Sequence, residues 1–236
     1  MRALVAYAHP DDESFGPAAI LADARAAGAE LHGLWLTRGE HGQPVADPPP
    51  DTHTLAAQRE RDLRQAAALI GFQTVEVLDY EDGALQHFAD ELITHVLDRL
   101  RQVRPDAVFT FGPGGITRHP DHIAVHYAAT AAFHRGLAEG LPLRELYYDA
   151  VPAVAARRSG IETELDGQPN TWIAVSEAAR HVKLAALAVH ARHVADARER
   201  LEQLEREPLR LEPLHRAWPP VLDGTTLSAI ASLAEA

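Results

Sequence analysis

The sequence predicts an α/β protein with a Rossmann-like fold, an open and mostly parallel sheet with helices on both faces. Short apolar segments alternate with longer helical ones through residues 1–150, and this alternation is typical of parallel strands joined by right-handed crossovers. The composition agrees, because 46% hydrophobic and 24% charged residues in a chain of 236 are usual for a folded globular protein. We expect the strand order 3-2-1-4-5.

The first β-α-β unit has clear boundaries. Residues 4–8 are apolar, and this strand ends at His9 because the proline that follows restricts the backbone to extended geometry. An Ala-rich helix over 14–27 ends at Gly28. The alternation continues with strands at 31–36, 75–78, 107–111 and 146–148, and with helices at 55–70, 88–103 and 120–135.

The other segments are less regular. Four prolines in residues 41–53 predict a long loop, and such loops are often functional. Further along, we expect irregular structure over 152–171, an edge strand at 172–175 and a charged helix at 177–207. We predict one domain over 1–236, in which 152–236 form a C-terminal extension packed on the sheet.

Charge and composition exclude several classes of protein. The net charge of −12 comes from 22 Lys and Arg against 34 Asp and Glu, so neither nucleic acid nor an anionic membrane is an expected partner. No segment reaches the roughly 20 apolar residues of a membrane span, and the first residues lack the pattern of a signal peptide. We expect a cytoplasmic protein with a small-molecule partner; its oligomeric state stays open, a homo-oligomer included.

The chain contains 14 histidines and no cysteine. The absence of cysteine excludes a disulfide framework, a thiol nucleophile and a thiolate metal site. Any transition metal must therefore be bound by nitrogen and oxygen, and imidazole is the commonest nitrogen ligand in proteins.

Two His-Pro-Asp segments directly follow predicted strands. AHPDDE at 8–13 follows the first strand, and RHPDH at 118–122 lies just after the fourth. Ligands of open α/β sheets bind beyond the carboxyl ends of the strands, where the strand order reverses. With the order 3-2-1-4-5 this point lies between strands one and four, so we expect the two segments to face each other.

The residue types in these segments suit a divalent metal. Catalytic zinc typically has three protein ligands from His and carboxylate side chains and keeps a water in its remaining position. His9, Asp12 and His122 make such a set. Asp11 would then be free to accept a proton from the water, whose pKa a bound metal lowers to roughly 7.

A second histidine accompanies the third of these ligands. His119 precedes His122 by three residues, and Pro120 suits the first position of a helix. One imidazole can bind the metal while the other reaches the substrate. We expect Asp121 to orient His119 and to raise its pKa, which favours an imidazolium that stabilises an oxyanion or protonates a leaving amine.

These segments resemble the LmbE-like, or PIG-L, family of zinc-dependent N-acetylglucosaminyl deacetylases. LTRGEHG at 36–42, DG at 82–83 and KLAALAVHARH at 183–193 extend the resemblance from position 4 to about position 193. It implies a single deacetylase domain. The ligands it implies are His9, Asp12 and His122, with Asp11 as general base and with His119, partnered by Asp121, acting on the oxyanion or the leaving group.

The resemblance also implies residues that bind the substrate. Arg59 would bind sugar hydroxyls or an anionic aglycone, Asp82 would line the sugar site, and Glu40 would belong to a loop over the pocket. Ordinary roles stay open for all three, as a solvated helix residue, an Asp-Gly turn and an exposed loop carboxylate. His193 stands where many relatives have glutamine or a similar residue, so the roles of His190 and His193 stay open.

The leading hypothesis is therefore a zinc-dependent hydrolase that removes the acetyl group from a small N-acetylglucosamine-type glycoside. The glycoside would be N-acetylglucosaminyl malate or an inositol conjugate, and Fe²⁺ or another divalent metal is the alternative to zinc. A metal-dependent phosphoesterase is a second hypothesis, although two-metal enzymes of that class generally need more carboxylate ligands. A non-catalytic sugar-binding protein on the same fold is the third.

Overall fold

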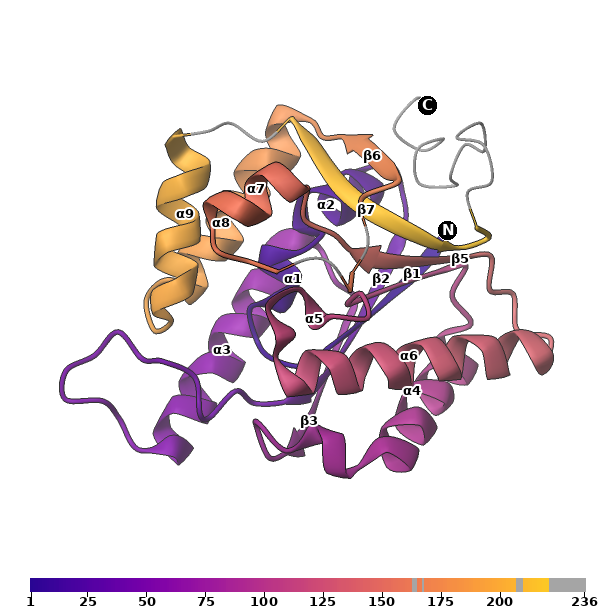
Figure 1. Ribbon diagram of the computed structural model, residues 1–236, viewed down its shortest axis with the longest axis horizontal. Coiled ribbons are helices and arrows are strands. Elements are labelled where there is room, and N and C mark those ends of the chain that lie inside the picture. Colours follow the sequence, from indigo (N-terminus) through magenta and orange to yellow (C-terminus); the bar gives the residue numbers. More distant parts are fainter. Residues whose placement is uncertain (163–164, 167, 207–209, 221–236) are drawn as a thin grey trace.

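The computed structural model describes residues 1–162, 165, 166, 168–206 and 210–220, and its centre is a seven-stranded sheet of order β3-β2-β1-β4-β5-β7-β6 (Figure 1). Strands β1 to β5 pair in parallel, whereas β7 pairs antiparallel with both β5 and β6. The predicted fold class and the predicted order 3-2-1-4-5 are confirmed, and two further strands extend the sheet beyond β5.

The strands are β1 (Arg2–Tyr7), β2 (Glu30–Thr37), β3 (Thr74–Tyr80), β4 (Ala107–Thr110), β5 (Glu145–Asp149), β6 (Thr171–Ala174) and β7 (Leu211–Trp218). The longer helices are α2 (Ala18–Ala26), α3 (Thr52–Ile70), α4 (Ala89–Val103), α6 (Pro120–Ala138), α8 (Glu177–His190) and α9 (Ala195–Arg206). Short helical turns are α1 (Asp12–Phe15), η1 (Leu85–His87), α5 (Gly115–Arg118) and α7 (Ala153–Arg158).

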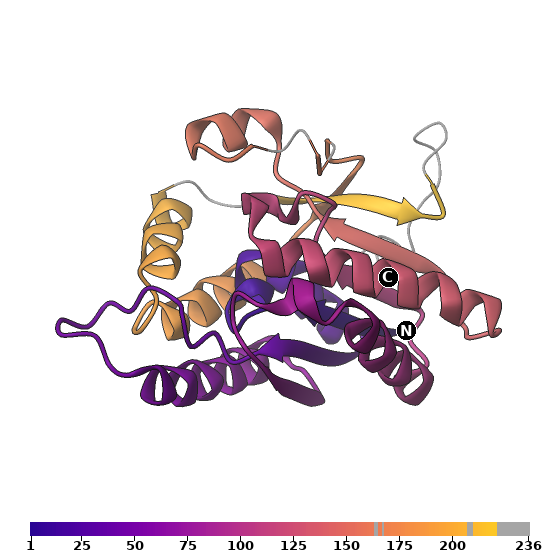
Figure 2. The same cartoon turned by 60° about the horizontal axis from the view of Figure 1, so that its bottom comes forward.

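Helices cover both faces of the sheet. Helices α4 and α6 pack against each other and against β1, while α2, α3 and α8 form a second layer (Figure 2). The central strand β1 is consequently buried on both sides, and its residues 3–7 are each at most 1% exposed. This is why β1 reads as a continuous apolar run rather than an alternating one. None of the described helices is long and apolar enough to cross a bilayer.

Two predicted helices are each divided in the structure. The helix expected over 14–27 is split into α1 and α2 at Gly16 and Pro17, because proline has no amide hydrogen to continue the first helix. The helix expected over 177–207 is divided into α8 and α9. At this break the amide of Val45 donates to the carbonyl of His193, and the amide of Ala195 donates to the carbonyl of Gln43. The 41–53 loop therefore pairs with backbone groups that would form hydrogen bonds within a continuous helix.

The C-terminal extension contributes strands to the sheet. The edge strand expected at 172–175 is β6, which lies at the end of the sheet order. Sequence patterns did not predict β7, which lies between β5 and β6. Its eight residues alternate only partly in hydropathy, and the extension therefore reads as irregular in the sequence. Residues 221–236, for which no role was predicted, lie outside the described part of the chain.

Candidate active site

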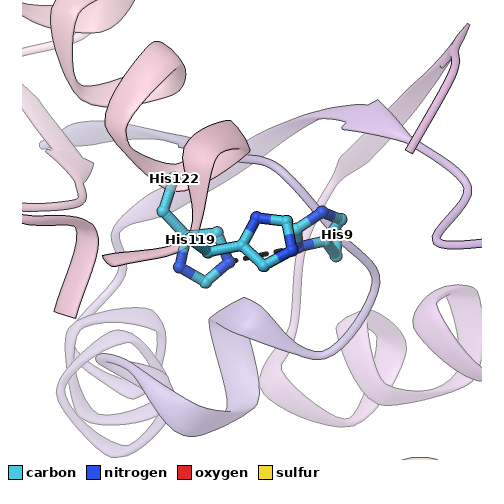
Figure 3. Close-up of side chains that lie close together, drawn as sticks. All are labelled: His9, His119 and His122. Carbon is cyan, nitrogen blue, oxygen red and sulfur yellow. Dashed lines mark hydrogen bonds between the residues drawn. The ribbon is translucent and has the colours of Figure 1, made fainter. Parts of the chain in front are cut away.

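The two His-Pro-Asp segments meet at the carboxyl ends of β1 and β4. These strands are direct neighbours in the sheet, so the turn after β1 and the amino end of α6 lie on the same side. Figure 3 shows the imidazoles of His9, His119 and His122 converging, with ring centroids 4.7–5.1 Å apart. The predicted convergence of the segments is observed.

The potential metal-binding atoms of His9, Asp12 and His122 are close together. His9 Nδ1 lies 3.1 Å from His122 Nε2. The two oxygens of Asp12 lie 3.7 Å from His9 Nδ1 and 3.4 Å from His122 Nε2, respectively. Ligands bound tetrahedrally at zinc distances of about 2.0–2.1 Å are roughly 3.3–3.4 Å apart. The two nitrogens are therefore spaced about as two ligands of one tetrahedral zinc ion would be, and each has a different oxygen of Asp12 nearby.

His119 is near enough to act beside this set. One ring nitrogen from each of His9, His119 and His122 lies within 4.8 Å of the other two. The remaining donor group of this kind among the described residues, formed by His9, Asp82 and Asp121, lies at the opposite nitrogen of the His9 ring.

Two buried carboxylates determine the orientation of His9. Its Nε2 lies 3.0 Å from Asp82 Oδ1 and 3.1 Å from Asp121 Oδ2, and its backbone amide donates to Asp12. Burial by itself lowers the pKa of His9, but the hydrogen bonds to Asp121 and Asp82 raise it to about 10. A pKa this high belongs to an imidazolium with a proton on both nitrogens, so a metal would have to replace the proton on Nδ1, which is directed toward Asp12 and His122, while Nε2 keeps its bonds to the two carboxylates.

The backbone of Gly115 determines the orientation of His122. His122 Nδ1 donates to the Gly115 carbonyl at 2.9 Å, so Nε2 keeps its lone pair. Burial and the neighbouring His9 lower the pKa of His122 well below its ordinary value, and the neutral form is the one that binds metal. Gly115 has φ 62°, and a Cβ there would lie 2.7 Å from the Cβ of His122. Only glycine fits this position.

Asp11 lies in the same turn but makes different contacts. Its carboxylate accepts a hydrogen bond from Arg59 Nη2 at 2.9 Å. Burial raises the pKa of Asp11, and the Arg59 guanidinium reduces this rise without cancelling it. A carboxylate with a raised pKa is a stronger base than an exposed one.

The expected pairing of Asp121 with His119 is wrong. The Asp121 carboxylate binds His9 and the backbone amides of Gly83 and Leu85. His119 Nδ1 instead accepts the Asp121 backbone amide at 3.2 Å. Burial and the charge of His9 lower the pKa of His119 rather than raise it. His119 is therefore a neutral imidazole with its proton on Nε2.

The residues expected to bind substrate make internal contacts. Arg59 is only 4% exposed and donates to the carbonyls of Gly39 and Pro10 as well as to Asp11. Asp82 binds His9 and accepts the His41 amide, and Glu40 in turn accepts the Asp82 amide. Asp82 and Gly83 form the turn of the ordinary alternative, whereas Arg59 is buried and Glu40 is half-buried rather than exposed. Their contacts support the turn after β1, and substrate binding by these three residues stays a prediction.

Sequence reasoning assigned no role to Glu13, although it stands in the AHPDDE motif. Glu13 is fully buried, and its Oε1 accepts a hydrogen bond from His190 Nε2 at 2.8 Å. His193 contacts a different carboxylate, that of Asp62. The AHPDDE motif contains Glu13, but its partner His190 lies 177 positions away in the sequence, so no local pattern predicts this contact.

The chain is similar in sequence to proteins named as deacetylases. The family described as "PIG-L: GlcNAc-PI de-N-acetylase" matches residues 4–133. A protein of Streptomyces avermitilis named 1D-myo-inositol 2-acetamido-2-deoxy-alpha-D-glucopyranoside deacetylase is 30% identical over 209 residues, which cover 75% of this chain and 70% of that protein. A probable N-acetyl-alpha-D-glucosaminyl L-malate deacetylase 2 of Bacillus subtilis is 28% identical and covers 91% of this chain and 92% of its own.

Other relatives are longer than this chain. A protein of Salinispora arenicola with the inositol-type name is 29% identical over 64% of this chain but only 56% of its own length, and the corresponding share for one from Kineococcus radiotolerans is 46%. The chain thus spans about half the length of these two relatives.

Solved structures share the fold at low sequence identity. N,N'-diacetylchitobiose deacetylase from Pyrococcus horikoshii has a TM-score of 0.68 at 20% identity and covers 91% of this chain and 83% of its own. GalB, the 4-carboxy-2-hydroxymuconate hydratase from Pseudomonas putida, has a TM-score of 0.71 at 18% identity and covers 96% of this chain and 99% of its own. The fold alone therefore does not distinguish a hydrolase from a hydratase.

Proposed function

Because this chain belongs to the PIG-L (GlcNAc-PI de-N-acetylase) family, we propose that it is a metal-dependent N-deacetylase that hydrolyses the acetamide of a small N-acetylglucosamine-type glycoside. The observation that carries the proposal is the convergence of His9, Asp12 and His122, with donor atoms 3.1–3.7 Å apart, next to the buried carboxylate of Asp11. The names of the relatives suggest an inositol or malate aglycone.

His9, Asp12 and His122 would hold the metal. Their two nitrogens and one carboxylate suit zinc, and Fe²⁺ accepts the same donor types. A divalent ion bound there would polarise the acetamide carbonyl and lower the pKa of water at the site.

The protein's own groups would carry the proton transfers. Asp11 would accept the proton of the water that adds to the carbonyl carbon. His119, neutral and protonated on Nε2, would donate a hydrogen bond to the carbonyl oxygen as it gains negative charge. When the C–N bond breaks, the nitrogen takes a proton from Asp11 and leaves as the free amine, and the acetic acid that forms loses its proton to solvent and is released as acetate.

The test combines metal analysis with an activity panel. Purified protein is assayed for acetate release from the N-acetylglucosaminyl conjugates of inositol and malate and from N,N'-diacetylchitobiose, before and after chelation and after zinc is restored. We expect acetate release that chelation abolishes and zinc restores. Metal-loaded protein that releases no acetate from any of these compounds, while it hydrolyses phosphate esters or hydrates 4-carboxy-2-hydroxymuconate, would sink the proposal.

A further inference from the structure

The backbone of Asp11 has an unusual conformation. Its φ is 121°, in a region that residues other than glycine seldom adopt because of the Cβ atom. Its carbonyl accepts the amides of Ser14 and Phe15 and so begins α1. A strained residue persists only where surrounding contacts impose its conformation, so the neighbours of Asp11 must hold this turn.

One set of contacts comes from α3. Arg59 Nη2 donates both to the Pro10 carbonyl at 2.7 Å and to the Asp11 carboxylate at 2.9 Å. These bonds fix the positions of the Pro10 carbonyl and of the Asp11 side chain. They leave the Asp11 amide to be fixed by another group.

The second set comes from Glu13 and α8. Glu13 Oε2 accepts the Asp11 amide at 3.2 Å, while Oε1 accepts the Ser14 hydroxyl at 2.6 Å and His190 Nε2 at 2.8 Å. Glu13 and His190 are at most 1% exposed. A buried carboxylate keeps a single position only when donors satisfy its oxygens, and His190 is the only one of these donors that comes from outside the turn.

The unpaired Nδ1 of His190 indicates that the hydrogen bond from Nε2 to Glu13 holds this side chain. His190 Nδ1 is buried and has no hydrogen-bond partner among the described residues. Leaving a buried ring nitrogen without a partner is costly, so a hydrophobic side chain would be the simpler choice if α8 needed only packing here.

We propose that Glu13 and His190 are positioning residues for Asp11. His190 holds Glu13, and Glu13 holds the Asp11 amide, so that the Asp11 carboxylate keeps its place next to Arg59. The inference rests on the proposed function, in which Asp11 is the base. Neither residue contacts the reacting atoms.

The kinetic test compares variants of His190. We expect His190→Ala to lower kcat by about 10- to 100-fold, because small misplacements of a reacting group have effects of this size, with KM and bound zinc unchanged. His190→Gln, whose amide can still donate to Glu13, should recover most of kcat, whereas the shorter His190→Asn should not. His181→Ala is the matched control, since His181 is an exposed histidine on the same helix.

A double variant tests whether His190 acts through Glu13. In the Glu13→Gln background, His190→Ala should lower kcat much less than it does in the native chain. If the double variant lost kcat by the product of the two single fold-losses, the two residues would act independently and the proposal would be overturned. Native kcat in His190→Ala would overturn it as well. Should His190→Ala not fold, the Gln and Asn variants supply the same comparison.

A readout that needs no activity separates this inference from the proposed function. Crystal structures of the native protein and of His190→Ala report the φ of Asp11 directly. We expect a value near 121° in the first and a negative value in the second. An unchanged φ would overturn the positioning role even if the protein proved to be a deacetylase, and a changed φ would support it even if no acetate were released.

Discussion

Asp121→Asn changes one atom and tests whether the carboxylates behind His9 support metal binding. Asp121 is fully buried and accepts three hydrogen bonds, from His9 Nε2 at 3.1 Å, from the Gly83 amide at 2.7 Å and from the Leu85 amide at 3.0 Å. Asparagine has one acceptor oxygen, so whichever way the amide turns, its NH₂ group faces at least one of these donors.

The expected loss follows from the contacts. Hydrogen bonds to a charged group contribute about 1.5–3 kcal/mol each. Residues that orient a metal ligand typically change metal affinity by about 10- to 100-fold, which corresponds to about 1.4–2.7 kcal/mol. We therefore expect Asp121→Asn to weaken zinc binding by a factor in this range, because His9 Nδ1 is no longer held toward Asp12 and His122.

Competition with a chromophoric chelator measures the zinc affinity at fixed pH. Asp79→Asn is the control, since the side chain of Asp79 is 88% exposed and does not contact His9. Native zinc affinity in Asp121→Asn, with the metal-free variant folded, would refute the reasoning that Asp121 orients His9. A loss of the same size in Asp79→Asn would show that the effect comes from net charge.

Three other substitutions test separate parts of the argument. Asp11→Asn should lower kcat for acetate release by about 10²- to 10⁴-fold with zinc still bound, and retention of full kcat would eliminate Asp11 as the base. His119→Ala should lower kcat by about 10²- to 10³-fold with little change in KM, whereas a pure rise in KM would assign His119 to substrate binding. Burial raises the pKa of Asp149 to about 7 despite its hydrogen bond from Tyr7, so the folded state binds more protons than the unfolded state between about pH 4 and pH 7 and its stability falls as the pH rises. Asp149→Asn should therefore gain stability over the native chain between pH 5 and pH 8, by at most about 3 kcal/mol, and urea unfolding that gives equal differences at both pH values would contradict this.

Local patterns predicted the features that depend on neighbouring residues. The proline after His9 ends the first strand, and the apolar run before it identifies a strand buried on both faces. Two His-Pro-Asp segments after strands one and four meet because these strands are adjacent in the sheet. The residues that converge at the candidate metal site could therefore be predicted from residue types, strand order and the rule for open α/β sheets.

Contacts between distant segments were not accessible in this way. Asp121 was expected beside His119 because they are two positions apart, yet residues at i and i+2 do not face each other on a helix, and Asp121 binds His9 instead. Arg59 was expected near the substrate, but the packing of α3 buries its guanidinium against Gly39, Pro10 and Asp11.

Hydropathy and short motifs were sufficient to predict the fold class, the order of the first five strands and the group of histidines and aspartates at one end of the sheet. The partner of each side chain became apparent only in the packed fold. The Glu13–His190 pair joins positions 177 apart, and β7 enters between β5 and β6. Such pairings depend on how whole elements pack, since the burial of a charged group is satisfied by whichever donor the fold brings near it.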